Sequence, residues 1–434
     1  MKNFEELALT PELASAVTAG GFTVPTPIQA QAIPLALQGH DIMGLAQTGT
    51  GKTLAFGLPM LNAILQNPGR PAPKTSKALI LAPTRELVNQ ISQTLGALTQ
   101  KTKVRVTTVV GGASIGKQLQ VLSRGTDILV ATPGRLIDLL ERGGVDLGQT
   151  RHLVLDEADQ MLDIGFIHAL RKIVPYLSKT RQTQLFSATM SKQMEELSRA
   201  YLTNPQKVQV SPPNLAADKI TQSVQFVEKP NKPAALRELL GKHPNTTTLV
   251  FARTKHGAEK LKKGLVADGF AATSVHGNKS QGQRDRAIKQ FRGGEMQILV
   301  ATDVAARGID IPTVGLVVNY ELPNVPENYV HRIGRTARAG RSGIAVTFCS
   351  ADEAKQLRDI EKLIKAPITV DGDTPDHMLS KRQDTPKPNG TKPKRRRQRG
   401  KPKGSQPGKP ANANGTGNGN GTRKRKPRPR RTAA

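Results

Sequence analysis

The chain has 434 residues, and its 64 Lys and Arg against 34 Asp and Glu give a formal net charge of +30. This length suits two domains with extensions, and the charge predicts a polyanionic partner, with nucleic acid ahead of an anionic membrane. A single cysteine, Cys349, excludes an intrachain disulfide, and we see neither a secretory signal nor an apolar run long enough to span a membrane, so a cytoplasmic protein is expected.

Apolar runs alternate with amphipathic helical patterns along the first half of the chain. Strands are predicted at residues 41–46, 77–83, 104–110, 126–132, 152–157 and 182–189. A helical pattern at residues 84–98 is typical of the segments between them. Near-continuous Val, Ile and Leu strands with helical crossovers predict a parallel sheet that is covered on both faces.

The second half repeats this alternation. Strands are predicted at residues 247–254, 271–277, 296–303, 314–321 and 343–350. Residues 203–230 are rich in Pro and Asn and lack a period, so we expect the join there, and periodicity ends after about residue 367. The predicted division is a first domain at 1–206, a linker at 207–217, a second domain at 218–366 and a tail at 367–434.

The C-terminal tail is strongly basic. Residues 381–434 hold 19 Lys and Arg and one acidic residue, Asp384. The tail is rich in Pro, Gly and Asn and has no aromatic residue, so it cannot bury a core and is predicted to be disordered. Its charge predicts electrostatic affinity for RNA.

The segment AQTGTGKT at residues 46–53 follows a predicted strand and opens a predicted helix. Glycines in such a turn let backbone N–H groups approach phosphate oxygens, and the helix N-terminus adds its dipole. Lys52 is expected to reach the β- and γ-phosphates, and the Thr53 hydroxyl to bind Mg²⁺. The phosphate-loop pattern begins with glycine where this chain has Ala46, which removes no ligand; an ordinary Gly-rich turn is the alternative. The candidate phosphate-binding residues are Ala46, Gln47, Thr48, Gly49, Thr50, Gly51, Lys52 and Thr53.

Three carboxylates lie at the end of the strand predicted at 152–157, in the order Asp156-Glu157-Ala158-Asp159. Because parallel strands end at one edge of a sheet, Asp156 is expected to face Lys52 and to hold Mg²⁺, directly or through water. Glu157 is expected to orient and deprotonate the attacking water. For Asp159, a helix N-cap and a partner on another motif both stay open.

Three further motifs are GFTVPTPIQ at residues 21–29, SAT at 187–189 and HRIGRTAR at 331–338. The last motif spaces Arg332, Arg335 and Arg338 at i, i+3 and i+6, which would place three guanidiniums on one helical face. A solvated basic face or a structural ion-pair cluster is the alternative. Together with a phosphate loop on another domain, we interpret the cluster as arginine fingers.

These motifs, in this order, resemble the DEAD-box RNA helicases over residues 1 to about 366. Length and tail are most similar to the RhlE-type bacterial branch. The resemblance implies two tandem RecA-like domains, with ATP and Mg²⁺ as cofactors and Arg335 and Arg338 at the γ-phosphate. It also implies that Gln29 reads adenine, that Phe22 packs on the base and that Phe4 is the family's isolated upstream aromatic.

The resemblance implies roles for further residues. Asp310 matches a ribose contact, and Gln281 and Arg284 match a motif that supports domain closure. Coupling between nucleotide and domain closure is implied for Ser187, Ala188, Thr189, Asp159, His331 and Arg332. Contacts to the RNA backbone are implied for Pro83, Thr84, Arg85, Gly111, Gly112, Thr132, Pro133, Gly134, Arg135, Arg253, Thr254 and Thr302.

The predicted function is RNA binding and local duplex unwinding coupled to ATP hydrolysis. An RNA-clamping or annealing protein and a DNA-stimulated ATPase on the same fold are the alternatives. Partners in ribosome assembly or RNA degradation are an expectation, and no membrane partner is expected.

Overall fold

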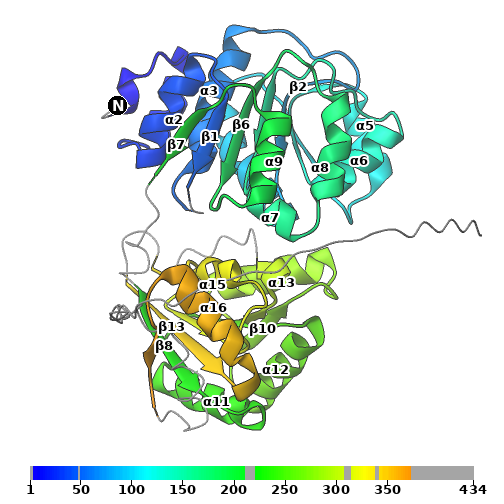
Figure 1. The fold of residues 1–434 in the computed structure, drawn as a ribbon. Helices are drawn as coiled ribbons and strands as arrows, with labels where there is room; N and C mark the ends of the chain where they lie inside the picture. Colours follow the sequence, from blue (N-terminus) through cyan, green and yellow to red (C-terminus); the bar gives the residue numbers. More distant parts are fainter. Residues whose placement is uncertain (1–2, 47–48, 211–219, 307–313, 338–341, 373–434) are drawn as a thin grey trace, which may run out of the picture. The chain divides into compact units, whose positions relative to one another are not determined.

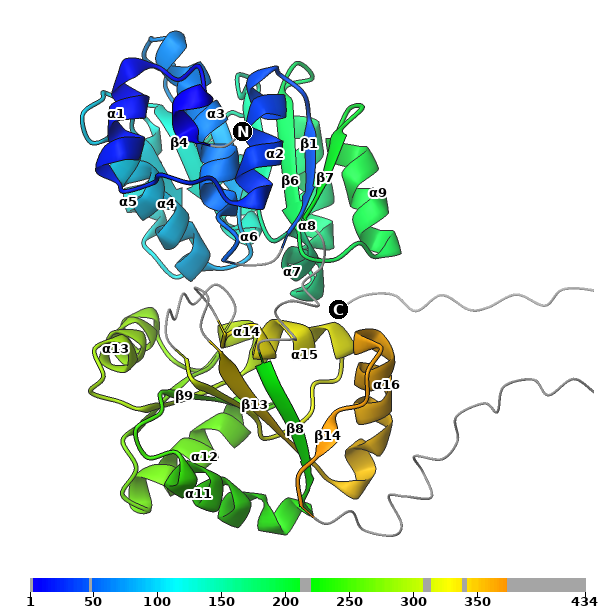
Figure 2. The same cartoon turned by 90° about the vertical axis from the view of Figure 1, so that its left-hand side faces the viewer.

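The computed structural model describes residues 3–46, 49–210, 220–306, 314–337 and 342–372. Over these residues the chain forms two parallel sheets of seven strands each, with helices on both faces of each sheet (Figure 1 and Figure 2). The predicted α/β class is confirmed. The basic tail at 381–434 lies outside the described residues, and none of the described helices combines the length and apolar character that a membrane span needs.

The first sheet has the strand order β3-β4-β2-β5-β6-β1-β7. Its strands are β1 (Ile42–Leu45), β2 (Ser76–Leu81), β3 (Val106–Val109), β4 (Thr126–Ala131), β5 (His152–Leu155), β6 (Gln182–Ser187) and β7 (Gln206–Gln209). The helices around it are α1 (Pro11–Ala19), α2 (Pro27–Leu37), α3 (Lys52–Gln66), α4 (Arg85–Thr99), α5 (Ile115–Leu122), α6 (Pro133–Glu141), α7 (Ala158–Asp163), α8 (Ile167–Ile173) and α9 (Lys192–Tyr201), with short 3-10 turns η1 (Phe4–Glu6) and η2 (Val174–Tyr176). Because all strands run parallel, the loops after β1, β5 and β6 meet at one edge of the sheet.

The second sheet has the order β10-β11-β9-β12-β13-β8-β14. Its strands are β8 (Ile220–Phe226), β9 (Thr248–Phe251), β10 (Ala272–Val275), β11 (Ile298–Ala301), β12 (Leu316–Asn319), β13 (Gly343–Cys349) and β14 (Thr369–Val370). Its helices are α11 (Lys232–Lys242), α12 (Lys255–Ala267), α13 (Gln281–Arg292), α14 (Asp303–Ala306), α15 (Pro326–Ile333) and α16 (Ala354–Ile364), with η3 (Lys229–Asn231) and η4 (Ala351–Glu353). The sheet edges again gather the loops that carry polar motifs.

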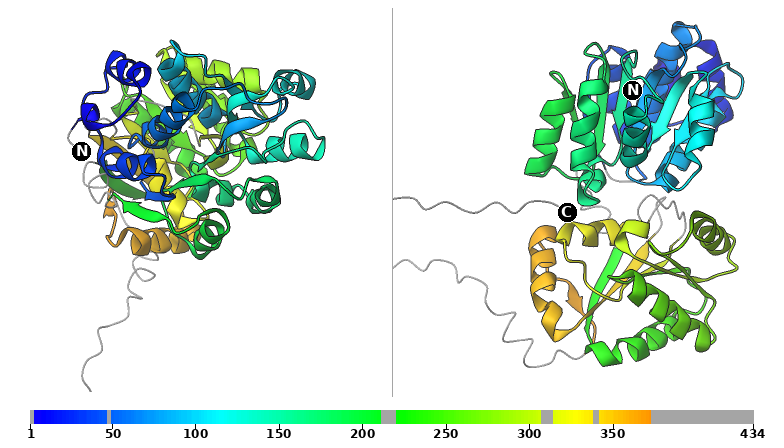
Figure 3. Two further views of the ribbon diagram at one scale, coloured as in Figure 1. Left: turned by 90° about the horizontal axis from the view of Figure 1, so that it is seen from above. Right: turned by 90° about the vertical axis from the view of Figure 1, so that its right-hand side faces the viewer.

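Each sheet has hydrophobic cores on both of its faces, and helices cover both faces in Figure 3. In β2, Ile80 packs into one core, and its neighbours Leu79 and Leu81 pack into the other. In β9, Val250 and Leu249 divide in the same way. This two-sided burial explains why the central strands are nearly continuous apolar runs.

Two strands lie within residues 203–230, where the sequence analysis expected the join and found no period. β7 lies at the edge of the first sheet, and β8 lies beside β13 and β14 of the second. β7 has the sequence QKVQ and β8 the sequence ITQSVQF, and each buries only some of its side chains. These polar strands lack the continuous apolar run by which the buried central strands were found.

The prediction of one helical face over 331–338 was wrong. α15 ends at Ile333, where Gly334 forms the C-cap, so Arg332 lies on the helix and Arg335 lies beyond it. Arg338 lies outside the described residues. A glycine at this position ends the helix because it removes the side chain that would favour its continuation.

Candidate functional site

The loop after β1 enters α3 through a left-handed glycine. Gly51, at φ +89°, is the N-cap of α3, and Gly49 has φ +87°. A Cβ on Gly51 would overlap the amide of Gln29, so the position requires glycine for space as well as for conformation. Gln47 and Thr48, also predicted in this loop, lie outside the described residues.

Gln29 and Thr26 hold this loop from the start of α2. The Gln29 side chain is 3% exposed; its Oε1 accepts from the Thr26 N–H at 2.8 Å and its Nε2 donates to the Gly51 carbonyl at 2.9 Å. The Thr26 hydroxyl donates to the Thr50 carbonyl at 2.7 Å. The predicted adenine-reading motif therefore contacts the phosphate loop directly.

The two predicted aromatics differ in exposure. Phe22 is 37% exposed, whereas Phe4 is 6% exposed and packs in the core of the first domain. Phe22 thus presents a ring that a base could cover, and Phe4 as it stands does not.

Lys52 and Asp156 meet where α3 begins and β5 ends. The Lys52 Nζ lies 3.6 Å from Asp156 Oδ1 and donates to the Ala46 carbonyl at 3.3 Å, and both side chains are buried. Burial opposes the charge on Lys52, but Asp156, Glu157 and Asp159 outweigh burial and raise the pKa of Lys52. Burial also raises the pKa of Asp156, to about 6, against the opposing effect of Lys52. The lysine therefore stays charged but does not fully compensate the buried carboxylate.

The acidic motif has a distinct backbone. Glu157 is buried and left-handed, with φ 51° and ψ 51°, and it is the N-cap of α7; its N–H donates to Asp156 Oδ1 at 3.0 Å. A left-handed residue other than Gly, Asn or Asp is uncommon and points to a functional constraint.

Asp159 joins the acidic motif to the loop after β6. Its Oδ2 accepts from the N–H groups of Ala188 and Thr189 at 3.0 Å each, and from the Thr189 hydroxyl at 3.2 Å. The Ser187 hydroxyl donates to the Thr189 carbonyl at 2.7 Å. Of the two roles left open for Asp159, the structure has the partner on another motif.

A second group of predicted residues lies at the ends of β2, β3 and β4. Thr84 caps α4 by accepting from the Leu87 N–H at 3.2 Å. Arg85 crosses over Gly112, which has φ +73° and on which a Cβ would overlap the Arg85 guanidinium. Burial and the nearby Arg284 and Arg135 lower the pKa of Arg85, against the opposing effect of Glu86. Gly112 therefore makes room for the Arg85 side chain.

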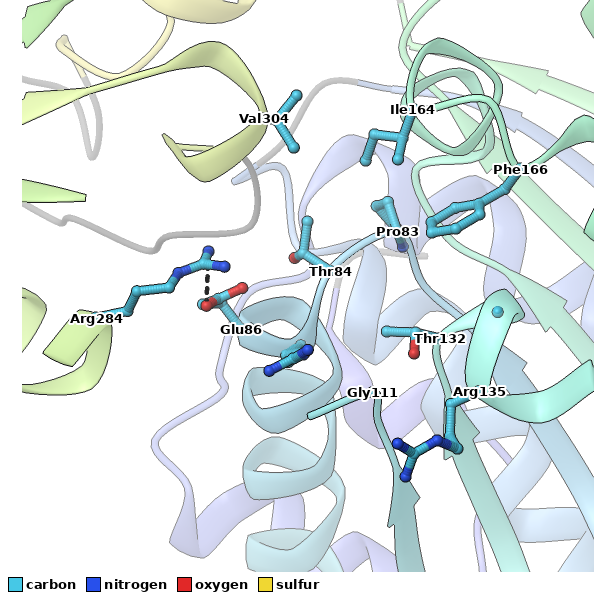
Figure 4. Close-up of a pocket in the computed structure, with 12 residues that line it drawn as sticks. Pro83, Thr84, Glu86, Gly111, Thr132, Arg135, Ile164, Phe166, Arg284 and Val304 are labelled. Atoms are coloured by element: carbon cyan, nitrogen blue, oxygen red, sulfur yellow. Dashed lines mark ion pairs between the residues drawn. The ribbon is translucent and has the colours of Figure 1, made fainter. Parts of the chain in front are cut away.

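These residues line a pocket of about 390 Å³ (Figure 4). Arg135 lies at its side and donates to the Ala113 carbonyl at 3.0 Å. Glu86 pairs with Arg284 at 2.9 Å, and Gln281 donates to Glu86 at 3.2 Å. The residues that line the pocket are Pro83, Thr84, Arg85, Glu86, Gly111, Thr132, Gly134, Arg135, Ile164, Phe166, Arg284 and Val304.

Ile164, Phe166 and Val304 give this pocket an apolar side that the sequence analysis missed. The segment after the acidic motif forms two helices, α7 and α8, with Gly165 at φ +91° between them. A glycine inside a helical pattern, with one apolar residue on each side, is the signal that could have indicated this break.

Arg332 lies at the carboxyl edge of the second sheet and is 1% exposed. Its guanidinium donates to both carboxylate oxygens of Asp303, at 2.5 and 2.8 Å, and to Asn319 Oδ1 and the Glu321 carbonyl. Arg335 is also buried, at 4% exposure. Asp310, like Arg338, lies outside the described residues. Arg332 thus contacts groups of its own domain.

Arg253 and Thr254 follow β9 at the same edge. The Arg253 guanidinium contacts Glu353 and donates to the Leu322 carbonyl at 3.3 Å. Thr254 caps α12 by accepting from the Gly257 N–H at 3.0 Å, and Thr302 lies just before α14. The sequence analysis missed Glu353, which is 100 residues from Arg253 in the chain.

Comparisons with known proteins agree with this arrangement. A family model described as DEAD/DEAH box helicase matches residues 26–197, and one described as Helicase conserved C-terminal domain matches residues 231–340. The chain is 43% identical over 367 residues to DEAD-box ATP-dependent RNA helicase 30 of Arabidopsis thaliana, covering 84% of this chain and 62% of that protein. It is 44% identical over 368 residues to ATP-dependent rRNA helicase rrp3 of Emericella nidulans, covering 85% and 78%.

Two solved structures share the fold. Dbp5 of S. cerevisiae bound to RNA and ADP BeF3 is similar with a TM-score of 0.77 and 34% identity, covering 86% of this chain and 96% of that one. Mss116p bound to ssRNA and AMP-PNP is similar with a TM-score of 0.76 and 31% identity, covering 87% and 80%. The two sheets are therefore tandem RecA-like domains. Taken with the phosphate loop and the Asp156–Asp159 motif at one sheet edge, these matches show that the chain belongs to the DEAD-box family of ATP-dependent RNA helicases.

Proposed function

We propose that this chain hydrolyses ATP at the edge of its first sheet and uses that reaction to bind RNA and separate short duplexes. The observation that carries the proposal is the buried pair of Lys52 and Asp156, 3.6 Å apart, beside a glycine-rich helix N-terminus. A buried cation, backbone N–H groups and a helix dipole at one point are suited to the phosphates of a nucleotide.

The residues here also fit Mg²⁺. The Asp156 carboxylate and the Thr53 hydroxyl offer the oxygen atoms that Mg²⁺ prefers as ligands. Because Lys52 only partly compensates the negative charge of the buried Asp156, the site favours a further cation. No group of three or more His, Cys, Asp or Glu among the described residues could enclose a metal, which suits an ion held mostly by water and substrate phosphates. When bound, Mg²⁺ would neutralise the charge that develops on the phosphates.

For the reaction we propose that Glu157 positions and deprotonates the attacking water, and that Arg335 and Arg338 stabilise the transferring phosphate from the second domain. Gln29 and Phe22 select adenine, and Asp310 contacts the ribose. Because Gln29 also bonds to Gly51, a base bound at Gln29 would be sensed by the phosphate loop.

Asp159 would couple the nucleotide state to domain closure, because its carboxylate already accepts hydrogen bonds from the N–H groups of Ala188 and Thr189. His331 and Arg332 would contribute from the second domain. A shift of the acidic motif on hydrolysis would then move the loop after β6, and ATP would act as a switch on RNA affinity.

The proposed RNA surface is the pocket around Arg85. Arginine, hydroxyl and backbone N–H groups suit sugar-phosphate contacts, which carry little sequence information. Dbp5 and Mss116p bind RNA in their solved structures, which supports the same partner here. The RNA contacts that we propose are Pro83, Thr84, Arg85, Gly111, Gly112, Thr132, Pro133, Gly134, Arg135, Arg253, Thr254 and Thr302.

The finer assignments are also proposals. β7 reaches Gln209 and β14 reaches Val370, so we place the ends of the two domains a few residues later than 206 and 366. The rRNA helicase named among the relatives supports a role in ribosome assembly. The relatives compared are plant and fungal proteins and give the RhlE-type branch no support. We also propose a cytoplasmic location, which the single cysteine supports.

The test compares ATP hydrolysis without nucleic acid, with RNA and with DNA, together with strand displacement on a short RNA duplex. RNA stimulation and ATP-dependent displacement are expected. Stimulation by DNA alone would favour the DNA-dependent alternative, and RNA stimulation with annealing but no displacement would favour the clamping alternative.

A further inference from the structure

Exposed basic residues on several helices of this protein have an acidic partner. On α6, α8, α11 and α16 these pairs cross one turn of helix or join neighbouring segments. They are Arg142–Asp138, Arg171–Glu196, Lys172–Glu141, Arg237–Asp268, Lys242–Glu238 and Lys362–Asp359.

α12 carries four lysines outside these pairs. Its thirteen residues include Lys255, Lys260, Lys262 and Lys263, and none of these four forms an ion pair within the described part of the chain. Three of them are exposed, and Lys262 is half-buried. We call these four residues the α12 lysines. Like charges one turn apart or closer destabilise a helix, so an anion bound there would relieve a cost of the folded state.

The one acid of α12 is occupied elsewhere. Glu259 accepts from the Ser274 hydroxyl at 2.8 Å and pairs with His276 Nε2 and Lys279 Nζ at 3.0 Å each. These partners belong to β10 and the loop that follows it. The carboxylate thus fixes α12 to the edge of the sheet and leaves the α12 lysines uncompensated.

α12 begins beside proposed RNA contacts of the second domain. It starts directly after Arg253 and Thr254, which are proposed RNA contacts, and thirteen residues extend for about 20 Å. Ala258 and Leu265 pack into a core of the second domain, so the lysines lie on the remaining faces of the helix.

We propose that the α12 lysines bind the phosphate backbone of RNA that continues past Thr254, beyond the strand held by the core motifs. This inference rests on the proposed function. Lysine is a compact charge with a flexible stem, suited to phosphates at variable positions rather than to bases. An anionic membrane suits the α12 lysines less well than RNA does, because the apolar face of α12 is already packed against the sheet and cannot enter lipid.

The test uses the full chain with Lys260→Gln and Lys263→Gln combined. The matched control is Lys355→Gln with Lys362→Gln, which removes the same charge from exposed positions of α16 in the same domain. Affinity is measured against salt for a short single strand and for that strand extended by a duplex. ATP hydrolysis without RNA should be unchanged in both variants, which reports a folded protein.

For the extended RNA, the α12 variant should bind on the order of tenfold more weakly at low salt, and its slope of log K against log salt should be shallower by about 1.4 to 1.8. The short strand should bind as it does to the wild type. The inference is overturned if the extended RNA keeps its slope, if the short strand weakens equally, or if the control variant loses as much. Failure of the wild type to bind either RNA would instead refute the proposed function itself.

Discussion

Substituting Gly112 tests whether this glycine contacts RNA itself or acts by leaving space for the Arg85 side chain. At φ +73° an alanine costs about 1–2 kcal/mol of backbone strain, and its Cβ would overlap the Arg85 guanidinium. The arginine must then leave its position. A hydrogen bond to a charged group is worth about 1.5–3 kcal/mol, so Gly112→Ala should weaken RNA binding by about 10- to 150-fold. Arg85→Ala should weaken it by a similar factor.

Gly111 supplies the matched control. A Cβ there would lie 3.4 Å from the Arg85 guanidinium, an ordinary contact, and Gly111 is not among the glycines with positive φ. Gly111→Ala should therefore leave the Arg85 side chain in place, and any change in RNA affinity that it causes reports the proposed RNA contact of Gly111 alone. The assay is RNA affinity for the wild type, both single variants and the Gly112→Ala/Arg85→Ala double variant, with ATP affinity as the measure of an intact first domain.

The double variant decides the question. If Gly112 acts through Arg85, removing both should cost no more than removing one, because residues that share one contact are not additive. Costs that add would show that Gly112 contacts RNA independently of Arg85, and would refute the account in which Gly112 acts by making room for Arg85.

Three other changes give distinct outcomes. Glu157→Gln should keep ATP and RNA binding but reduce turnover at least 100-fold, as general-base removal does, and wild-type turnover would exclude it from the reaction. Gln29→Ala should relax the preference for ATP over GTP by about 1–3 kcal/mol and, because the bond to Gly51 is lost, should also weaken binding of inorganic pyrophosphate; unchanged values of both would contradict the assignment. Glu259 has a pKa lowered to about 2 from its ordinary 4.5, because hydrogen bonds from His276, Ser274 and Lys279 outweigh its burial. Its stabilisation is complete above pH 4.5 and is lost as the pH falls toward 2, so the melting temperature of Glu259→Gln should fall less than that of the wild type over this window.

The central strands and the loops after them could be predicted from the sequence, for one physical reason. A strand covered on both faces must be apolar along its whole length, and a phosphate loop must carry glycines where the backbone turns. β2 and β5 meet the first condition, and Gly51 meets the second. β7 and β8 do not meet the condition on strands, because they lie at or near a sheet edge and expose polar side chains.

Contacts between distant residues could not be predicted in this way. The regular spacing of Arg332, Arg335 and Arg338 suggested one face of a helix. The partner that determines where Arg332 lies is Asp303, 29 residues earlier and on another element. Spacing describes only neighbours on the same element, so it could not distinguish an arginine that reaches a nucleotide from one held by a carboxylate.

The buried pair of Lys232 and Glu353 is a further contact between residues that are distant in the chain. The Lys232 Nζ lies 2.6 Å from Glu353 Oε2 and also donates to the carbonyls of Tyr320 and Phe348. Burial opposes the charge on Glu353, but Lys232 outweighs burial and lowers the pKa of Glu353. An apolar pair of similar volume could be as stable, so stability alone does not account for these charges. What an apolar pair cannot do is bond to the ends of β12 and β13 and, through the second oxygen of Glu353, to Arg253 after β9. The pair therefore sets where three strand ends lie at the edge that carries the proposed RNA contacts of the second domain.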